Sequence, residues 1–390
     1  MKGFRVHSIK RTLKQFLRGV LYCCPVNRNK IVFVNYDGKG YGDNPKYIAE
    51  EFLRQDLPVK LVWLVSGDYF VPDVIRRVNI SGLKASFELS TAKVVISNSK
   101  SNIPSFFRKK KNQFYLQTWH GDFALKYIEK EVENELSASY VARSKADSAM
   151  TDAVVSGSSS FSKILRESFW LPEGCSILEF GVPRNDIYFK GDSYIDSLKQ
   201  TLGFASEDRI LLYAPTFRDK GETDCFDLDF EELRTTMCDV TGTEWKIVVR
   251  LHPNISSRVD LFCFNESIIN GSVISDQQEL CMISDCLVTD YSSIMGDFLL
   301  MRKPVFLYVP DLERYSSQVT GRGLRDLFYE LPVSFCRTQG DLEELITEFD
   351  PVLYHKAVDC FIQTHYQSFD DGHASERIVH YLSQALHFKV

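Results

Sequence analysis

His120 directly follows the apolar run "QFYLQTW" (113–119), which has the composition of a strand. A histidine has an ordinary pKa of about 6.5, so at neutral pH it can take a proton from an alcohol. Trp119 and Gly121 flank it, a bulky ring and a residue that lets the backbone turn sharply. These neighbours favour a general base over a structural histidine. Asp122 would either orient the imidazole ring or cap the helix that follows.

A second histidine stands in "VVRLHPN" (248–254), where Arg250 and His252 occupy alternate positions of a strand end. Alternate positions of a strand share one face, and Pro253 would end the strand. Two neighbouring donor or cationic groups suit a phosphate. The alternative is a buried arginine ion pair beside a histidine with a structural hydrogen bond.

The segment "LVTDYSSIMGDFLL" (287–300) changes from a strand pattern to a helical pattern. Polar residues stand between the two patterns, namely Thr289, Asp290, Ser292 and Ser293. Small hydroxyl residues at a helix N-terminus expose backbone N–H groups at the positive end of the helix dipole. The segment therefore predicts a phosphate cradle without the lysine of a P-loop, and an ordinary helix cap is the alternative.

The segment "APTFRD" (214–219) also places a hydroxyl residue and a cation directly after a strand. Arg218 could hold a phosphate through two parallel hydrogen bonds, with Thr216 beside it, or it could pair with a nearby acid. The acidic pattern "DLD" (227–229) could bind a metal, but it lies in a polar acidic stretch and favours a solvated loop.

Glycines alternate in "YDGKGYGDNPKYIAEEF" (36–52), before Asn44 and Pro45 begin a helix. Glycines at this position, including Gly40, allow a ligand to approach the backbone closely. The spacing is not GxGxxG, and no acidic partner for a ribose can be assigned. We therefore exclude a dinucleotide site here.

Strand patterns alternate with helical patterns along the whole chain, which predicts βαβ units and parallel sheets. The strand-like runs are "KIVFVNY", "VKLVWLV", "AKVVISN" and "QFYLQTW" in the first half, and "RILLYAPT", "WKIVVRLHP", "DCLVTDYSS" and "PVFLYVP" in the second. Several are apolar on both faces, as expected for sheets covered by helices on both sides. Two such domains would face each other with the candidate residues at the carboxyl ends of their strands.

The chain is long and apolar enough for two domains, with 390 residues of which 44% are hydrophobic. A polar stretch with glycines around 190–208 predicts a boundary near 200, between a first domain of 29–200 and a second of 201–390. The last helix of the second domain is a candidate for packing back on the first. Ten cysteines show no CxxC pair, which indicates reduced thiols in a cytosolic enzyme rather than a zinc site or disulfides.

Residues 1–28 form a basic leader in front of an acidic body. Residues 1–30 carry eight Lys or Arg and no acid, and since the total charge is −6 the rest carries −14. Apolar residues recur in the leader at helical spacing, namely Val6, Ile9, Leu13, Phe16, Leu17, Val20 and Leu21. The leader predicts a basic amphipathic helix, which would attach to an anionic membrane surface or pack on the first domain. Arg18 interrupts the apolar stretch, which argues against a membrane-spanning helix.

Taken in order, nine segments resemble the CDP-glycerol glycerophosphotransferase family of teichoic acid and capsule polymer synthesis. They are "GKGYGDNPKYI", "STAKVVISNS", "YLQTWHG", "FGVPRND", "APTFRD", "RLHPN", "SDCLVTDYSSIMGDF", "KPVFLYVPDLERY" and "DGHASERIVHYL". The resemblance implies the GT-B fold, with two facing Rossmann-like domains. It also implies transfer of glycerol phosphate from CDP-glycerol to a hydroxyl of a lipid-linked or polymeric acceptor, with release of CMP.

The resemblance implies roles for residues that match the family motifs. His120 would be the base, and Arg250 and His252 would hold or neutralise the diphosphate. Donor-binding candidates are Thr216, Arg218, Thr289, Asp290, Ser292 and Ser293, and acceptor-side candidates are Gly40, Asn44, Trp119, Gly121, Asp122 and Lys126. These groups would take up the developing charge without a metal, and Mg²⁺ remains an alternative.

The leader would bring the cleft to the inner face of the cell membrane, where a lipid-linked acceptor resides. This predicts a cytoplasmic protein bound peripherally to the membrane, with no nucleic acid partner. The family commonly continues "HG" with Thr-Pro-Leu-Lys, whereas this chain has "DFALK" (122–126). The difference falls on the acceptor side, so the alditol and the acceptor stay open.

Two alternative functions remain at this point. The first is a CDP-ribitol phosphotransferase or another GT-B enzyme that uses a nucleotide sugar, because the fold does not select the donor. The second is a catalytically silent module that binds a polyanion through the leader and "RKKK" (108–111). The base and the phosphate cradle argue against the silent module.

Overall fold

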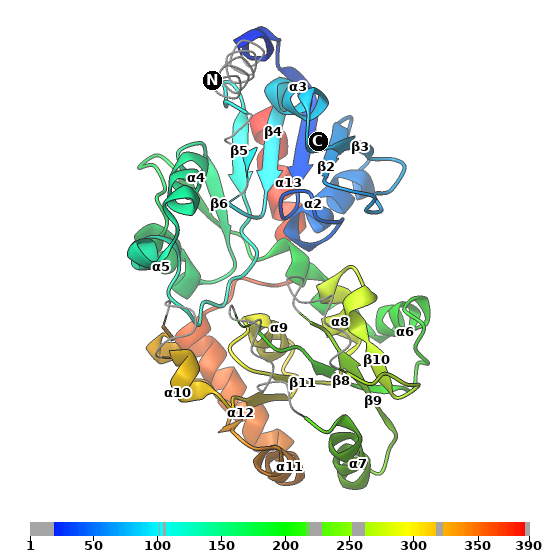
Figure 1. Ribbon diagram of the computed structural model, residues 1–390. Coiled ribbons are helices and arrows are strands. Elements are labelled where there is room, and N and C mark those ends of the chain that lie inside the picture. Colours follow the sequence, from blue (N-terminus) through cyan, green and yellow to red (C-terminus); the bar gives the residue numbers. More distant parts are fainter. Residues whose placement is uncertain are drawn as a thin grey trace, which may run out of the picture.

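The first domain of the computed structural model is built on a sheet of seven parallel strands, in the order β3-β2-β1-β4-β5-β6-β7 (Figure 1). The structure describes residues 19–100, 102–103, 107–216, 218, 228–251, 262–316 and 323–386. The strands are β1 (Asn27–Val34), β2 (Lys60–Val65), β3 (Arg76–Asn79), β4 (Ala92–Ser97), β5 (Phe114–Gln117), β6 (Ala153–Ser156) and β7 (Ser176–Glu179).

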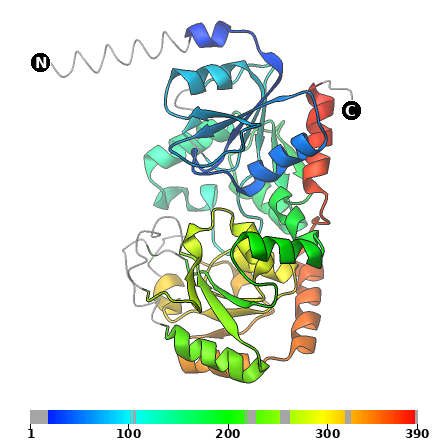
Figure 2. The ribbon, with the colours of Figure 1, turned by 90° about the vertical axis from the view of Figure 1, so that its right-hand side faces the viewer.

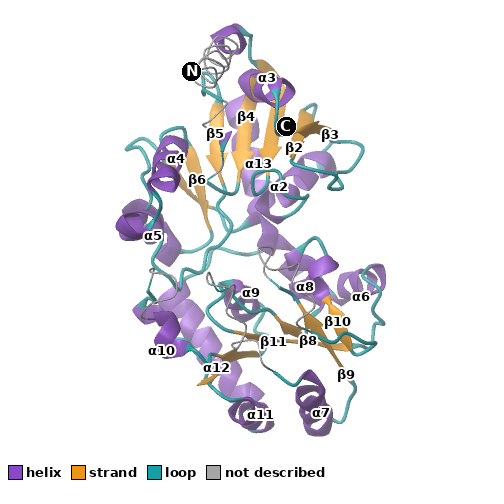
Figure 3. Ribbon diagram, in the orientation of Figure 1, coloured by secondary structure: helices purple, strands orange, loops and turns teal. Residues whose placement is uncertain are grey.

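Helices cover both faces of this sheet, as Figure 3 shows. They are α2 (Asp43–Arg54), α3 (Leu83–Thr91), α4 (Ala138–Ser148) and α5 (Ser159–Ser168), with short 3₁₀ turns at η2 (Glu129–Glu135) and η3 (Pro183–Phe189). Alternate residues of β1 enter different cores. Ile31 and Phe33 join the core beside α2, while Val32 and Val34 join the core beside α3. This two-sided burial explains why the strand is a continuous apolar run.

The second domain has six parallel strands in the order β10-β9-β8-β11-β12-β13. They are β8 (Arg209–Tyr213), β9 (Trp245–Val249), β10 (Ile268–Asn270), β11 (Cys286–Thr289), β12 (Val305–Tyr308) and β13 (Phe335–Cys336). The helices are α6 (Asp192–Thr201), α7 (Phe230–Thr241), α8 (Gln277–Ile283), α9 (Ile294–Leu300), α10 (Leu312–Arg314), α11 (Gln339–Thr347) and α12 (Pro351–Phe361), with short turns η6 (Gly271–Val273), η8 (Asp326–Phe328) and η9 (Ile362–Tyr366). The prediction of two α/β domains with parallel sheets is confirmed.

The chain crosses between the domains twice. After the last strand of the first sheet, η3 lies between the domains, and α6 already packs in the second domain through Leu198. α6 thus packs with the second domain. After α12, the chain returns through residues 366–373 to α13 (Ala374–Leu386), which packs on α2 (Figure 2). Ile378, Val379 and Leu382 of α13 belong to the core of the first domain.

All eight strand-like runs of the sequence form strands. The strands that the sequence analysis missed are β3, β6, β7, β10 and β13, and each has four residues or fewer. Runs this short carry little periodic signal, and of the described strands of four residues or fewer the sequence predicted β5, β11 and β12. The helix predicted in the leader falls mainly on residues 1–18, which lie outside the described residues. Among the described residues, none of the helices combines the length and the apolar character needed to cross a membrane.

Candidate active site

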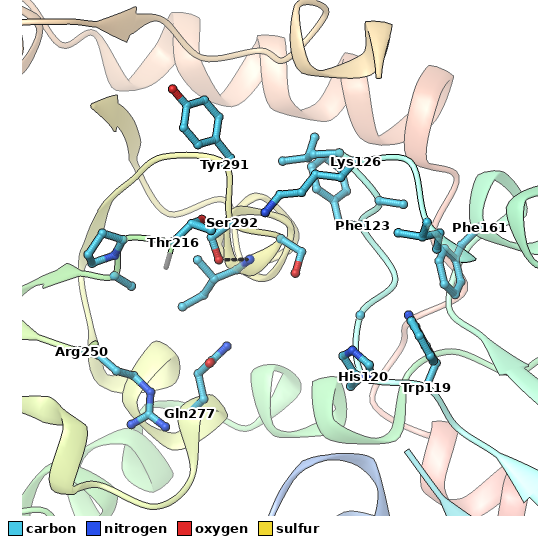
Figure 4. A pocket seen from close by; sticks show the side chains of 18 of the residues that line it. Trp119, His120, Phe123, Lys126, Phe161, Thr216, Arg250, Gln277, Tyr291 and Ser292 are labelled. Carbon is cyan, nitrogen blue, oxygen red and sulfur yellow. Dashed lines mark hydrogen bonds between the residues drawn. The ribbon is translucent and has the colours of Figure 1, made fainter. Parts of the chain in front are cut away.

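A cavity of about 360 Å³ lies between the two domains, at the carboxyl ends of both sets of strands (Figure 4). The first domain contributes the segment after β5, and the second contributes the segments after β8, β9 and β11. The lining side chains that bear on the chemistry are Trp119, His120, Lys126, Thr216, Arg250, Gln277, Tyr291, Ser292 and Ser293. The parallel sheets therefore bring the predicted base and several predicted phosphate-binding residues to one cavity.

His120 presents one ring nitrogen to the cavity. Its Nδ1 lies 2.7 Å from the carbonyl oxygen of Asn98. Because a carbonyl oxygen can only accept, Nδ1 carries the proton and Nε2 has a free lone pair. Burial lowers the pKa of His120 below its ordinary value, although the Asn98 carbonyl opposes the change. The ring is therefore neutral at pH 7 and able to act as a base.

The backbone before His120 is strained. Trp119 has a φ of 54°, in the left-handed region that residues with a β-carbon rarely adopt. Its N–H donates to the side chain of Gln117 at 2.9 Å, and its carbonyl accepts from Asn44 Nδ2 at 3.1 Å. The indole ring packs 4.2 Å from the His120 ring and edge-on to Phe169. Interactions from two sides thus hold the loop in a conformation that aims His120 at the cavity.

Arg250 follows β9 and faces His120 from the opposite side of the cavity (Figure 4). Its Nη1 donates to the carbonyl oxygens of Gly271 at 3.0 Å and Ile274 at 2.6 Å. No carboxylate of the described residues lies within 4.0 Å of its guanidinium, and burial lowers its pKa. A cation held by carbonyls and facing a cavity is suited to bind an anion. His252, the predicted partner of Arg250, lies outside the described residues.

Ser292 and Ser293 line the cavity directly before α9, as the sequence predicted. Ser292 Oγ accepts weakly from the N–H of Ile294 at 3.4 Å, and Ser293 is exposed. The two domains approach closely here, because a β-carbon added to Gly121 would lie 3.6 Å from Ser293 Oγ. The loop that carries His120 therefore faces Ser292 and Ser293 across a narrow part of the cavity.

Of the other predicted donor-side residues, Arg218, Thr289 and Asp290 are engaged inside the second domain, and Thr216 also lines the cavity. Arg218 is only 1% exposed and pairs with Asp290 at 2.9 Å and with Asp311 at 2.8 Å. The pairing alternative left open by the sequence is thus the one observed, because burial requires a counter-charge. Asp290 also accepts from the Thr216 N–H at 2.8 Å, and Thr289 Oγ1 donates to Ala214 O at 2.7 Å. These contacts fix the loops after β8 and β11 around the cavity.

The predicted acceptor-side residues divide between lining and supporting positions. Trp119, Gly121 and Lys126 line the cavity, and the Lys126 ammonium lies 5.4 Å from the centre of the Tyr315 ring. Gly40 does not line it; with a φ of 78° it turns the chain so that its carbonyl accepts from the Trp63 indole. Asn44 supports the loop after β5. Its Nδ2 donates to the carbonyl oxygens of Thr118 and Trp119, and its Oδ1 accepts from the backbone N–H of Arg184.

Both sequence-based expectations for Asp122 were wrong. The Asn98 carbonyl, not Asp122, orients the His120 ring. Asp122 Oδ1 instead accepts from the Gly157 N–H at 2.8 Å, and the next helical turn begins only at Glu129. Burial raises the pKa of Asp122 to about 6, which the Gly157 hydrogen bond opposes. A β-carbon on Gly157 would lie 2.3 Å from Val182 Cγ2 and 2.9 Å from Asp122 Oδ2, so a larger residue at 157 would disturb this packing.

Sequence reasoning missed three residues of the site region, Asn98, Arg184 and Gln277. Asn98 stands in "AKVVISN" and Arg184 in "FGVPRND", and both segments had been singled out without a role for the residue. Gln277 begins α8 and lines the cavity near Arg250 (Figure 4). Among the described residues there is no group of three or more His, Cys, Asp or Glu side chains that could hold a metal ion.

Comparisons with known proteins agree in the family they indicate. A family model described as CDP-glycerol:poly(glycerophosphate) glycerophosphotransferase matches residues 17–384. A teichoic acid glycerol-phosphate transferase of Staphylococcus aureus is 30% identical, with 95% of this chain and 98% of the relative aligned. A teichoic acid poly(glycerol phosphate) polymerase of Staphylococcus epidermidis is 29% identical over 97% of this chain, which spans only 55% of that longer relative.

A solved structure extends the likeness to the whole fold. It is a variant of the wall teichoic acid polymerase TagF that was soaked with CDPG, and it superposes with a TM-score of 0.84 at 27% identity. The match covers 98% of this chain and 97% of that one. The similarity thus extends over both domains.

Proposed function

Because the chain belongs to the CDP-glycerol:poly(glycerophosphate) glycerophosphotransferase family, we propose that it transfers glycerol phosphate from CDP-glycerol to a hydroxyl of a polymeric or lipid-linked acceptor. The observation that carries the proposal is the pairing of a neutral His120 with Arg250 across one cavity. One group accepts a proton and the other neutralises a phosphate. Transfer of a phosphoryl group to an alcohol needs both.

The reaction is a displacement at the phosphorus that carries glycerol. The acceptor hydroxyl gives its proton to His120 Nε2 while its oxygen forms a bond to that phosphorus. The bond from the phosphorus to the oxygen that bridges the two phosphates breaks, and CMP leaves with the electron pair. Arg250 stabilises the charge that develops on the leaving phosphate, and Ser292 and Ser293 hold the donor. Placing acceptor and donor from opposite domains supplies most of the rate through positioning.

The acceptor and the place of action follow from the same proposal. We assign the acceptor to the first domain, beside Trp119 and Lys126, and the nucleotide to the second, beside Arg250 and Gln277. Residues 1–28, with their excess of basic residues, would hold the protein on the anionic inner face of the membrane. Deleting residues 1–24 should then release the protein from anionic liposomes and leave transfer to a soluble acceptor intact; unchanged liposome binding would exclude that role.

The direct test measures acceptor-dependent CMP release from CDP-glycerol and, in parallel, from CDP-ribitol. His120→Ala should lower kcat by about 10²- to 10⁴-fold, the range for loss of a general base, while donor affinity stays within about twofold. His380→Ala is the matched control, because His380 is exposed on α13 in the first domain and does not line the cavity.

Each outcome separates the candidate functions. Release of CMP from CDP-glycerol alone supports the proposal. Release of CMP from CDP-ribitol alone would mean that the protein transfers ribitol phosphate instead of glycerol phosphate. Full activity in His120→Ala would refute the role of the base. Absence of release from both donors, with folded protein and several acceptors, would favour a binding module without catalysis.

A further inference from the structure

Arg184 lies in η3, the segment that joins the two domains, and its side chain is only 6% exposed. Burial disfavours its charged form, but the carboxylates of Asp297 and Asp43 outweigh this and raise its pKa. The two acids come from different domains, Asp43 from the start of α2 and Asp297 from α9. Arg184 is therefore a buried cation shared between the domains.

On the side of the first domain, Arg184 is bonded to the loop that carries His120. Its Nη1 donates to the His120 carbonyl oxygen at 3.0 Å and to Asp43 Oδ2 at 3.0 Å. Its backbone N–H donates to Asn44 Oδ1 at 3.1 Å, and Asn44 holds the strained Trp119. A shift of this guanidinium would therefore change the position of the proposed base.

On the side of the second domain, the contact is longer. Nη2 of Arg184 lies 3.7 Å from Asp297 Oδ2, beyond hydrogen-bond distance. Asp297 Oδ2 and Arg184 Nε are both buried without a hydrogen-bond partner. Asp297 is in the first turn of α9, the helix that begins directly after Ser292 and Ser293. A small approach of α9 toward η3 would bring Asp297 Oδ2 within hydrogen-bond distance of Arg184 Nη2 and move the end of the cavity that carries the two serines.

We propose that Arg184 is a positioning residue that couples α9 to the His120 loop, so that closure of the Arg184–Asp297 contact aligns the base with the bound donor. The proposal rests on the function proposed above. It predicts a separation of effects, because breaking the contact misplaces the base relative to α9, whereas Arg250 and Gln277 keep their places within the second domain. Misplacement by about 1 Å costs rate rather than affinity.

The test replaces Asp297 by asparagine, which keeps the shape and removes the charge. Asp297→Asn should lower kcat for acceptor-dependent CMP release about tenfold or more, with the KM for CDP-glycerol within about twofold. Glu279→Gln is the matched control, because Glu279 also makes an ion pair between the domains, to Lys46 at 2.6 Å, away from the His120 loop. A kcat of Asp297→Asn equal to that of Glu279→Gln, or a loss confined to KM, would overturn the proposal.

A second readout works without turnover. The ¹³Cε1 NMR signal of His120, assigned among eight histidines with His120→Ala, should shift in Asp297→Asn and stay in place in Glu279→Gln. An unshifted signal in Asp297→Asn would exclude coupling even if the protein proves inactive with CDP-glycerol. A shifted signal in a protein without CMP release would keep the coupling and reject only the proposed function.

Discussion

At the scale of single residues, Arg250 has the clearest consequence. Among the described residues, the guanidinium of Arg250 bonds to carbonyl oxygens and faces a cavity, so it remains charged and able to bind a phosphate. Arg250→Gln should weaken CDP-glycerol binding about 10- to 100-fold, as expected for loss of hydrogen bonds to a charged group. Titration calorimetry measures this directly.

The control for Arg250 is Arg209→Gln, which removes an arginine that pairs with Asp285 at the surface of the same domain. Donor affinity should not change in this variant. If Arg250→Gln binds CDP-glycerol as tightly as Arg209→Gln does, Arg250 does not hold the donor.

The sequence predicted which residues lie at the site, but not which hydrogen-bond and ion-pair partners they have. The sequence identified His120 and the serines before α9 as cavity residues, because strand ends are where such groups serve chemistry. It left Arg218 undecided between phosphate and acid, since Asp311 is remote in the chain and only packing brings it to the guanidinium. For Asp122 the local pattern misled, because its partner is the Gly157 N–H rather than a neighbour in sequence.

At the scale of elements, the start of α2 supports the loop after β5. Asn44 links Thr118, Trp119 and Arg184 through three hydrogen bonds. Asn44→Ala should leave two carbonyls and one N–H without these partners and lower the free energy of unfolding by about 1–3 kcal/mol. It should also lower kcat for CMP release at unchanged donor affinity, because the strained Trp119 can relax.

Chemical denaturation and steady-state kinetics together check this prediction. Asn27→Ala is a suitable comparison, because the hydrogen bond that its side chain makes to the described residues is a local one, from the N–H of Asn29 at the start of β1. Loss of stability with full kcat in Asn44→Ala would assign Asn44 to the fold alone.

The elements themselves were largely predictable, because long strands that are buried on both faces have an unmistakable pattern. The short strands at the sheet edges, and β6, were missed because so few residues give only a weak pattern. Their position depends on hydrogen bonds to a neighbouring strand, as for Ala153 opposite Leu116 of β5. The strained loop at Trp119 was also hidden, since a tryptophan at positive φ follows no propensity rule.

At the scale of the whole molecule, Asp370 lies where the chain returns to the first domain, close to Asp122. Burial and the nearby Asp122 carboxylate together raise the pKa of Asp370 to about 7, while the Val182 N–H opposes the change. The folded protein therefore binds a proton here that the unfolded chain releases above about pH 4. Stability from this proton is complete below pH 4 and is lost as the pH rises through about 7.

Asp370→Asn should therefore flatten the dependence of stability on pH. One such proton contributes a slope of about 1.4 kcal/mol per pH unit to the free energy of unfolding, so the decline between pH 5 and 7 should be smaller in the variant. Urea denaturation across this range measures the slope. Asp359→Asn, at an exposed ion pair with Arg302, should keep the wild-type slope; an equal slope in Asp370→Asn would contradict the titration of Asp370.

The return of α13 to the first domain has a consequence for biosynthesis. A ribosome completes β1 to β7 long before it makes Ile378, Val379 and Leu382, yet these side chains belong to the same core. While the second domain is being synthesised, the apolar surface beside α2 in the nascent first domain stays exposed, because α13 has not yet been made. Final maturation of the first domain is thus tied to translation of the second, and a product terminated before residue 374 would expose a surface that chaperones and proteases recognise.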